Sequence, residues 1–238
     1  MVGGTGGIGG AVARSLALRG ADIFLLGTRD GGRMAAALAS LRGLGVQAEG
    51  LPMDLERESR FDFVAMLGPE PRFDILIAAF GPFLRKPLAS TSTADWLDIA
   101  RLDLALPGAL ASFVLPGMVE RKWGRIVFFG GTGTDTIRGY STNSAYAAAK
   151  TGLGVLAKSV AIQHASDGIG AFVACPGLVD TEYLDSATRR ALAAKSPGGM
   201  LIQTDAIGET VATLAAADPC LASGSIVAMD GGLSFAKA

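Results

Sequence analysis

The chain has 238 residues, of which half are hydrophobic and 18% are charged, and its formal net charge at pH 7 is −1. This length suits a domain with a sizeable core, and the near-zero charge gives no electrostatic reason to expect binding to nucleic acid or to an anionic membrane surface. The apolar stretches are interrupted by Gly, Pro or charge before the roughly 18 residues of a membrane span. No secretory signal and no metal-like cysteine spacing is recognisable, so a reducing cytoplasm is the expected location.

The predicted elements alternate between helices and short apolar runs. A glycine-rich segment comes first, and the helical patterns after it cover 11–20, 33–43, 61–67, 95–120, 145–165 and 205–217. Apolar runs that indicate strands cover 22–27, 46–51, 73–81, 124–131, 168–177 and 224–232. Such alternation predicts a single α/β domain over 1–238, with a doubly wound parallel sheet, helices on both faces and a ligand beyond the carboxyl ends of the strands.

The opening "MVGGTGGIGG" fits two phosphate-binding templates. Gly4, Gly6 and Gly9 satisfy G-x-G-x-x-G, whereas Gly3, Gly7 and Gly9 satisfy the wider G-x3-G-x-G. In either case the glycines let the backbone approach a pyrophosphate, and the N-terminus of the following helix offers free N–H groups. Taken alone, the segment is also compatible with a flexible glycine-rich tail.

A second candidate feature is "SAYAAAK", which places Tyr146 and Lys150 four residues apart on one face of a helix. A free tyrosine has a pKa of about 10, and a nearby ammonium group lowers it by stabilising the phenolate. The pair is therefore a candidate general acid or base. The alternative is an ordinary pair on a helix surface.

In combination these motifs resemble the short-chain dehydrogenase/reductase family, in particular its 3-oxoacyl-[acyl-carrier-protein] reductase-like members, along nearly the whole chain. The resemblance rests on six motifs in the family's order, and this order favours the G-x3-G-x-G template. The motifs are "VGGTGGIG", with Val2 in place of Thr, and then "MDL", "DILIAAFG", "AYAAAK", "CPGLVDT" and "GSIVAMDGG". A Rossmann-type fold is what this resemblance implies.

The resemblance also implies catalytic roles. Tyr146 would protonate a substrate carbonyl oxygen in reduction and act as the base in oxidation, while Lys150 would lower the pKa of Tyr146 and bind the nicotinamide ribose. The family's serine, about thirteen residues before the tyrosine, is missing, so its role is assigned to Thr132, with Thr134 as the alternative. Asp103 stands where the family has an asparagine, and it could pair with Lys150, bind a water or simply lie in solvent.

The cofactor expected from the resemblance is NADP(H) rather than NAD(H). Arg29, in "LLGTRD", suits a ribose 2′-phosphate, although Asp30 would favour NAD(H) if the alignment were shifted. The cofactor-binding residues implied by the motifs are Gly3, Thr5, Gly7, Ile8, Gly9, Arg29, Asp54, Leu55, Lys150, Pro176, Gly177 and Thr181.

The sequence therefore predicts an NADP(H)-dependent oxidoreductase that reduces a carbonyl to a secondary alcohol, or catalyses the reverse. The partners expected are a small-molecule substrate and further copies of the chain in a homodimer or homotetramer, and the segment 178–200 has the position of the family's substrate loop. The alternative is a catalytically weak or inactive dinucleotide-binding protein. It is motivated by the changes at the serine and asparagine positions and by Ala78 and Ala79, which replace two family asparagines.

The start of the chain raises a separate question. Family members have about five or more residues of central strand before the glycines, and here only Val2 represents the end of that strand. Unpaired backbone groups on the two neighbouring strands would cost roughly 1–3 kcal/mol each if buried. We therefore expect this chain to be an N-terminally shortened form of the natural protein. The alternative is that another segment or a partner chain takes the place of the missing strand.

Overall fold

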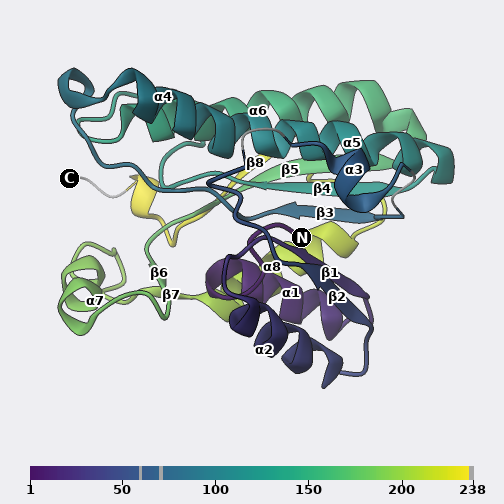
Figure 1. Ribbon diagram of the computed structural model, residues 1–238. Helices are drawn as coiled ribbons and strands as arrows, with labels where there is room; N and C mark the ends of the chain where they lie inside the picture. The colour runs from purple at the N-terminus through teal and green to yellow at the C-terminus, as the bar shows by residue number, and fades with distance from the viewer. Residues whose placement is uncertain (59–60, 70–71, 236–238) are drawn as a thin grey trace.

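The computed structural model describes residues 1–58, 61–69 and 72–235. Parallel strands form a layer between two layers of helices (Figure 1). The main strands are β1 (Ile23–Leu26), β2 (Ala48–Leu51), β3 (Ile75–Ala78), β4 (Gly124–Phe129), β5 (Ile169–Pro176) and β8 (Ile226–Met229), and a separate short pair is formed by β6 (Val179–Asp180) and β7 (Ile202–Gln203). Each of these strand pairs is parallel, so the predicted doubly wound parallel sheet is confirmed.

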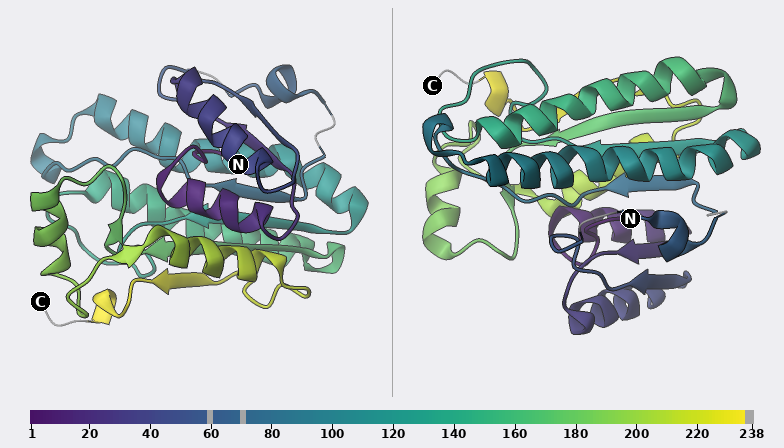
Figure 2. Two further views of the ribbon diagram at one scale, coloured as in Figure 1. Left: turned by 90° about the horizontal axis from the view of Figure 1, so that it is seen from below. Right: turned by 45° about the horizontal axis from the view of Figure 1, so that its top comes forward.

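The helices divide between the two faces of the sheet. In Figure 1 the helices α4, α5 and α6 lie above the sheet, and α1, α2 and α8 lie below it. Their bounds are α1 (Gly7–Ala17), α2 (Gly31–Arg42), α3 (Phe63–Leu67), α4 (Thr93–Ala100), α5 (Leu106–Arg121), α6 (Ser144–His164), α7 (Ser186–Ala193) and α8 (Thr204–Ala216). Figure 2 shows the same division from two other directions, with α1 and α8 side by side.

The central strands are buried on both faces, which explains why they read as continuous apolar runs. In β4, Ile126 and Phe128 pack in the cluster that includes residues of α5 and α6. Val127 and Phe129, which alternate with them, pack in the cluster that includes α1 and α8. Each cluster is a hydrophobic core, and the carboxyl ends of the strands between them present the loops that carry the predicted site.

The helical region predicted at 95–120 contains a local irregularity. A π-helical turn, Arg101–Ala105, joins α4 to α5 and turns Asp103 into the interior. The run Thr93–Arg121 is long and apolar enough to be considered for a membrane span. It is instead a core element, because α5 buries a stripe of side chains in the cluster shared with the sheet, namely Leu106, Leu110, Val114 and Met118.

The first strand of the sheet is reduced to the first residues of the chain, as expected. Val2 forms isolated bridges to Leu26 on one side and to Ala78 on the other, so the order across the molecule is β2-β1-Val2-β3-β4-β5-β8. The Val2 N–H donates to the Ile77 carbonyl at 2.9 Å, and the Ala79 N–H donates to the Val2 carbonyl at 3.0 Å. The β1–β2 pair is thus joined to the rest of the sheet through a very short backbone connection.

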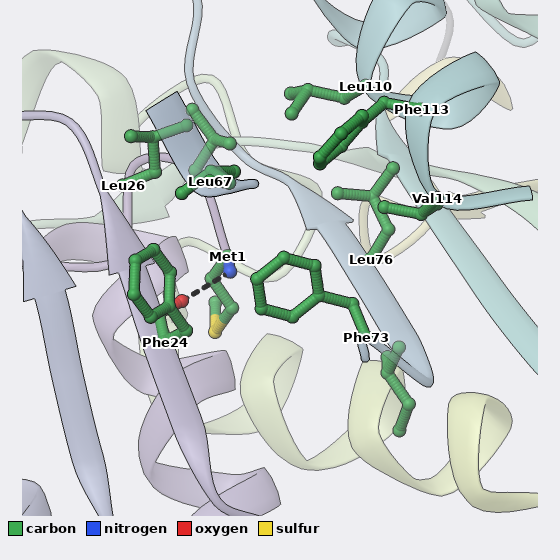
Figure 3. A pocket seen from close by; sticks show the side chains of 11 residues that line it. Met1, Phe24, Leu26, Leu67, Phe73, Leu76, Leu110, Phe113 and Val114 are labelled. Atoms are coloured by element: carbon green, nitrogen blue, oxygen red, sulfur yellow. Dashed lines mark hydrogen bonds between the residues drawn. The ribbon is translucent and has the colours of Figure 1, made fainter. Parts of the chain in front are cut away.

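Beside Met1, where the backbone ladder between β1 and β3 stops, apolar side chains line the space between these two strands. Figure 3 shows the rings of Phe24 and Phe73 on either side of Met1, with α5 contributing Phe113; the centroids of the Phe24 and Phe73 rings are 5.6 Å apart. The α-amino group of Met1 donates to the Phe24 carbonyl at 2.6 Å, and burial lowers its pKa to about 5. The space between β1 and β3 beside Met1 is therefore apolar, with the ionisable α-amino group of Met1 at its edge.

A short apolar extension should stabilise the chain. Four apolar residues such as Val-Ala-Ile-Val placed before Met1 would continue the parallel ladder toward Phe24 and Ile75, with each recovered hydrogen bond contributing about 1 kcal/mol. The expected result is a Tm higher by several degrees in thermal unfolding, at roughly 2–4 °C per kcal/mol for a domain of this size. A Gly-Ser extension of equal length is the control, and equal Tm values for the apolar-extended and unextended chains would contradict the idea.

Candidate active site

The glycine loop begins directly after Val2, at the carboxyl end of the sheet. Gly3 has φ +80°, and a Cβ there would lie 3.0 Å from the Ala79 backbone. A Cβ on Gly9 would lie 2.0 Å from the Gly3 carbonyl oxygen. Gly3 therefore lets the loop pass close to the end of β3, and Gly9 lets the first turn of α1 pack onto the loop, which explains two glycines of the G-x3-G-x-G template.

This loop forms one wall of a cavity of about 360 Å³. The cavity brings together parts of the chain that are far apart in sequence: the start of α1, the residues after β1 and β3, and the residues after β6. Of the predicted cofactor residues, its lining includes Gly3, Thr5, Gly7, Ile8, Gly9 and Thr181. Pro176, Gly177, Asp54 and Leu55 stand outside this lining, at or just beyond the ends of β5 and β2.

Arg29 lies beyond the end of β1 among carboxylates. Its guanidinium is 3.8 Å from Asp54 and 3.8 Å from Glu56, and its side chain is 65% exposed. Asp30 has a different task, because its carboxylate caps α2 by accepting hydrogen bonds from the Gly32 and Arg33 N–H groups. The carboxylate of Asp30, which would have favoured NAD(H), therefore serves as the N-cap of α2.

Tyr146 and Lys150 lie one turn apart on α6, as their spacing predicts. The Lys150 Nζ lies 2.9 Å from Asp103 Oδ1, and the two side chains are only 5% and 0% exposed. It also lies 5.8 Å from the centroid of the Tyr146 ring. Of the alternatives open for Asp103, the structure shows pairing with Lys150 rather than exposure to solvent.

The charge balance at this pair corrects one expectation. Burial raises the pKa of Tyr146, and the negative charge of Asp103 raises it further. The pKa of Asp103 is itself raised by burial, against the opposing effect of Lys150. The expected lowering of the Tyr146 pKa is therefore wrong, because burial of the phenol and the negative charge of Asp103 raise that pKa instead.

The hydroxyl groups before α6 are arranged as follows. A Cβ on Gly131 would lie 2.7 Å from the Tyr146 hydroxyl oxygen, so the position facing that hydroxyl is a glycine. Thr134 is buried, and its hydroxyl accepts from the Gly131 N–H and donates to the Gly131 carbonyl. The half-buried Thr132 donates to the Pro176 carbonyl at 3.2 Å. Thr134 thus stabilises the turn and Thr132 contacts the end of β5, so the assignment of the serine role to Thr132 stays a prediction.

Several residues near the site were not singled out by the sequence. Arg33 and Tyr183 line the cavity, and Glu182 contacts the start of α1. Phe83 packs edge-on against the Tyr146 ring, with centroids 4.9 Å apart, and is itself 63% exposed. Arg33, Glu182 and Tyr183 are ordinary polar residues whose positions only the fold reveals.

Comparison with known proteins identifies the family. A family model described as enoyl-(acyl carrier protein) reductase matches residues 3–234. The chain belongs to the short-chain dehydrogenase/reductase family. It is 29% identical to the 3-oxoacyl-[acyl-carrier-protein] reductase of Escherichia coli, over 98% of this chain and 95% of that protein. It is 31% identical to the cis-4-hydroxycyclohexanecarboxylate dehydrogenase of Sinomonas cyclohexanicum, over 98% and 94%.

Solved structures agree with this family. A 3-oxoacyl (acyl-carrier-protein) reductase from Agrobacterium tumefaciens C58, with NADP bound, superposes with a TM-score of 0.83 at 26% identity, covering 97% of this chain and 92% of that one. The fold is therefore a Rossmann-type nucleotide-binding fold, and the family membership makes the chain an oxidoreductase of alcohol and carbonyl groups.

The buried pair should behave as a unit in unfolding experiments. Asp103→Asn or Lys150→Met alone leaves one uncompensated buried group and should cost about 3–5 kcal/mol of unfolding free energy. The double variant should lose clearly less than the sum of the two, as measured by urea denaturation. Asp98→Asn, which affects an exposed carboxylate 3.5 Å from Arg101, is the control and should change little. Strictly additive losses would show that the two side chains do not interact.

Proposed function

We propose that this chain reduces a carbonyl to a secondary alcohol with NADP(H), or catalyses the reverse, using Tyr146 as the proton donor and acceptor. The observation that carries the proposal is the position of Gly81. It lines the glycine-loop cavity, and a Cβ there would lie 2.9 Å from Lys150 Nζ and 2.0 Å from Asp103 Oδ1. One end of the cavity thus adjoins the Tyr146–Lys150 pair.

The residues present fit a dinucleotide. Gly3 and Gly9 let the loop and the start of α1 pack closely, since side chains there would meet backbone atoms. The N-terminus of α1 is thereby placed beside the cavity, where it offers backbone N–H groups with a favourable dipole. When bound, the cofactor supplies or accepts a hydride. Thr5, Ile8 and Thr181 would contact it from the cavity wall, Asp54 and Leu55 from beyond β2, and Pro176 and Gly177 from the end of β5.

The chain's own residues would transfer the proton and position the groups that take part in this transfer. Tyr146 gives its phenolic proton to the substrate oxygen in reduction, and Thr132 would hold that oxygen after leaving the Pro176 carbonyl to which it donates. Lys150 binds the nicotinamide ribose, and Asp103 keeps the ammonium group of Lys150 in place. Because the pKa of Tyr146 is raised, the phenol stays protonated through neutral pH, which suits the reducing direction better than proton abstraction in oxidation.

Arg29 supports NADP(H) as the preferred cofactor. Its guanidinium stands at the end of β1 with most of its surface exposed, where it could leave its weak contacts with Asp54 and Glu56 for a 2′-phosphate. The NADP-bound reductase among the structural relatives is consistent with this preference.

We propose one domain over 1–238, with 178–200 as the substrate loop, working in the cytoplasm as a homodimer or homotetramer. Exposed apolar side chains on α6 and α4 offer contact surface for further copies, namely Val155, Ile162 and Leu97. Cys175 and Cys220 are free thiols, as a reducing compartment would allow.

A second candidate is a dinucleotide-binding protein with little or no turnover. The observation that favours it is Gly131, which places no hydroxyl opposite the Tyr146 hydroxyl. A screen of ketones with NADPH, followed by absorbance, separates the two candidates, since the second predicts cofactor binding without oxidation of NADPH.

Tyr146→Phe should abolish carbonyl reduction, because the variant has no proton to donate, and should leave NADPH affinity within about twofold. The measurements are the kcat for a ketone found in the screen and fluorescence titration of NADPH. Tyr140→Phe is the control, since that phenol donates to the Gly133 carbonyl. A Tyr146→Phe enzyme with near wild-type kcat would overturn the assignment.

Arg29→Ala should weaken NADPH far more than NADH. Loss of a charged contact to phosphate should cost about 1.5–3 kcal/mol, or roughly 10- to 150-fold in Kd. Arg57→Ala provides the matched control, because Arg57 pairs with the same Asp54 at 3.5 Å and is 85% exposed. Equal losses for the two cofactors would mean that Arg29 does not bind the 2′-phosphate.

A further inference from the structure

A carboxylate from a distant segment occupies the start of α1. The Gly7 N–H donates to Glu182 Oε1 at 2.8 Å and to Oε2 at 3.2 Å. Glu182 lies between β6 and α7, in a segment that stands apart from the two helix layers in Figure 1. The free N–H groups at a helix N-terminus are a natural place for an anion, and here the anion belongs to the protein itself.

Two further side chains converge on the same point. Arg33, in the first turn of α2, lies 3.9 Å from Glu182 Oε1 and donates to the Tyr183 hydroxyl at 2.5 Å. A Cβ on Gly6 would lie less than 3 Å from polar atoms of all three side chains. The cluster of Arg33, Glu182 and Tyr183, which we call the latch, therefore closes directly over the glycine loop.

The latch is charged and held by several contacts. Burial works to raise the pKa of Glu182, but the hydrogen bonds from backbone N–H groups and from Tyr183 and the charge of Arg33 outweigh it, so the pKa is lowered and the carboxylate is ionised at neutral pH. Arg33 and Glu182 keep side-chain exposures of 44% and 53%, so their ion pair is a weak, solvent-screened one. The Arg33–Glu182 ion pair is thus present in this structure, and little free energy is needed to break it.

A carboxylate and a phosphate cannot share this position, because two anions in one small cradle repel each other. Resting on the proposed function, we propose that Glu182 stands in for the cofactor pyrophosphate when no dinucleotide is bound, and that binding displaces it and transfers Arg33 from Glu182 to a phosphate oxygen. Arg33 would then be a second phosphate-binding residue, distinct from Arg29, which lies among Asp54 and Glu56.

The proposal has a quantitative consequence. If the binding-competent form is only a fraction of the population, the apparent Kd rises by the inverse of that fraction. Removing the Glu182 carboxylate should therefore tighten the binding of ligands that carry a pyrophosphate and leave the binding of those without one unchanged.

The experiment is calorimetric titration of wild type, Glu182→Gln and Glu182→Ala with ADP, adenosine and NADPH. We expect the Kd for ADP and NADPH to fall about three- to tenfold in both variants, with no change for adenosine. Asp185→Asn is the matched control, because it removes a carboxylate of the same segment that caps α7 and does not reach the glycine loop. It should leave all three affinities unchanged.

Arg33→Met in the Glu182→Ala background tests the transfer of Arg33. With the latch already absent, this change should raise the Kd for ADP severalfold if Arg33 binds phosphate. An unchanged Kd for ADP in this double variant would overturn the role of Arg33.

The remaining outcomes separate the latch from the proposed function. ADP affinities in both Glu182 variants equal to or weaker than that of the wild type would overturn the latch and leave the proposed function standing. A folded wild-type chain that binds neither ADP nor NADPH, with Glu182 variants that also bind neither, would overturn the function itself. Because Glu182→Gln keeps the size and polarity of the side chain, it covers the case in which the alanine variant unfolds.

Discussion

The backbone hydrogen bonds of Met1, Val2 and Gly3 are the connection on which the rest of the molecule depends. They are what joins β1 to β3, since the Leu26 N–H donates to Met1 and the Ala79 N–H donates to Val2. The glycine loop follows in the next residues, so the same contacts set the position of the cofactor cradle. A disturbance at this point would loosen the sheet and the phosphate-binding loop together.

A second constraint acts at the other end of the cavity. The Asp103–Lys150 pair is buried against the backbone of Gly81, and this packing leaves no room for a side chain there. The π-helical turn is what allows α4 and α5 to run on as one helical stretch while Asp103 points inward. The ammonium group of Lys150 is therefore held beside Asp103, while burial of the phenol and the charge of Asp103 raise the pKa of Tyr146.

The sequence was sufficient for the fold because each element carries a local signal. The apolar runs at β3, β4 and β5 are buried on both faces, and the close contacts of Gly3 and Gly9 demand glycine. Within the candidate site, the Tyr146–Lys150 spacing was equally readable, since i and i+4 residues share a helix face. The reduced first strand was also predictable from the short stretch before the glycines.

The parts that could not be predicted depend on tertiary neighbours. The direction of the Tyr146 pKa depends on burial and on a carboxylate more than forty residues away, which no local pattern encodes. The contact of Glu182 with Gly7 joins residues 175 positions apart, and Glu182 has no sequence feature that distinguishes it from a solvent-exposed carboxylate. The irregular turn around Asp103 was hidden because apolar periodicity does not distinguish a π-helical turn from an α-helix.

The pairing of β6 with β7 has a mechanical consequence. Val179 pairs with Ile202 and Asp180 with Gln203, so both ends of the segment that carries α7 are fastened to each other rather than to the main sheet. This two-stranded base is itself packed on the main core, because Val179 and Ile202 contact the cluster that includes α1 and α8. Glu182 and α7 both lie between β6 and β7, so the carboxylate at the glycine loop and the helix of the proposed substrate loop share one anchor on the core.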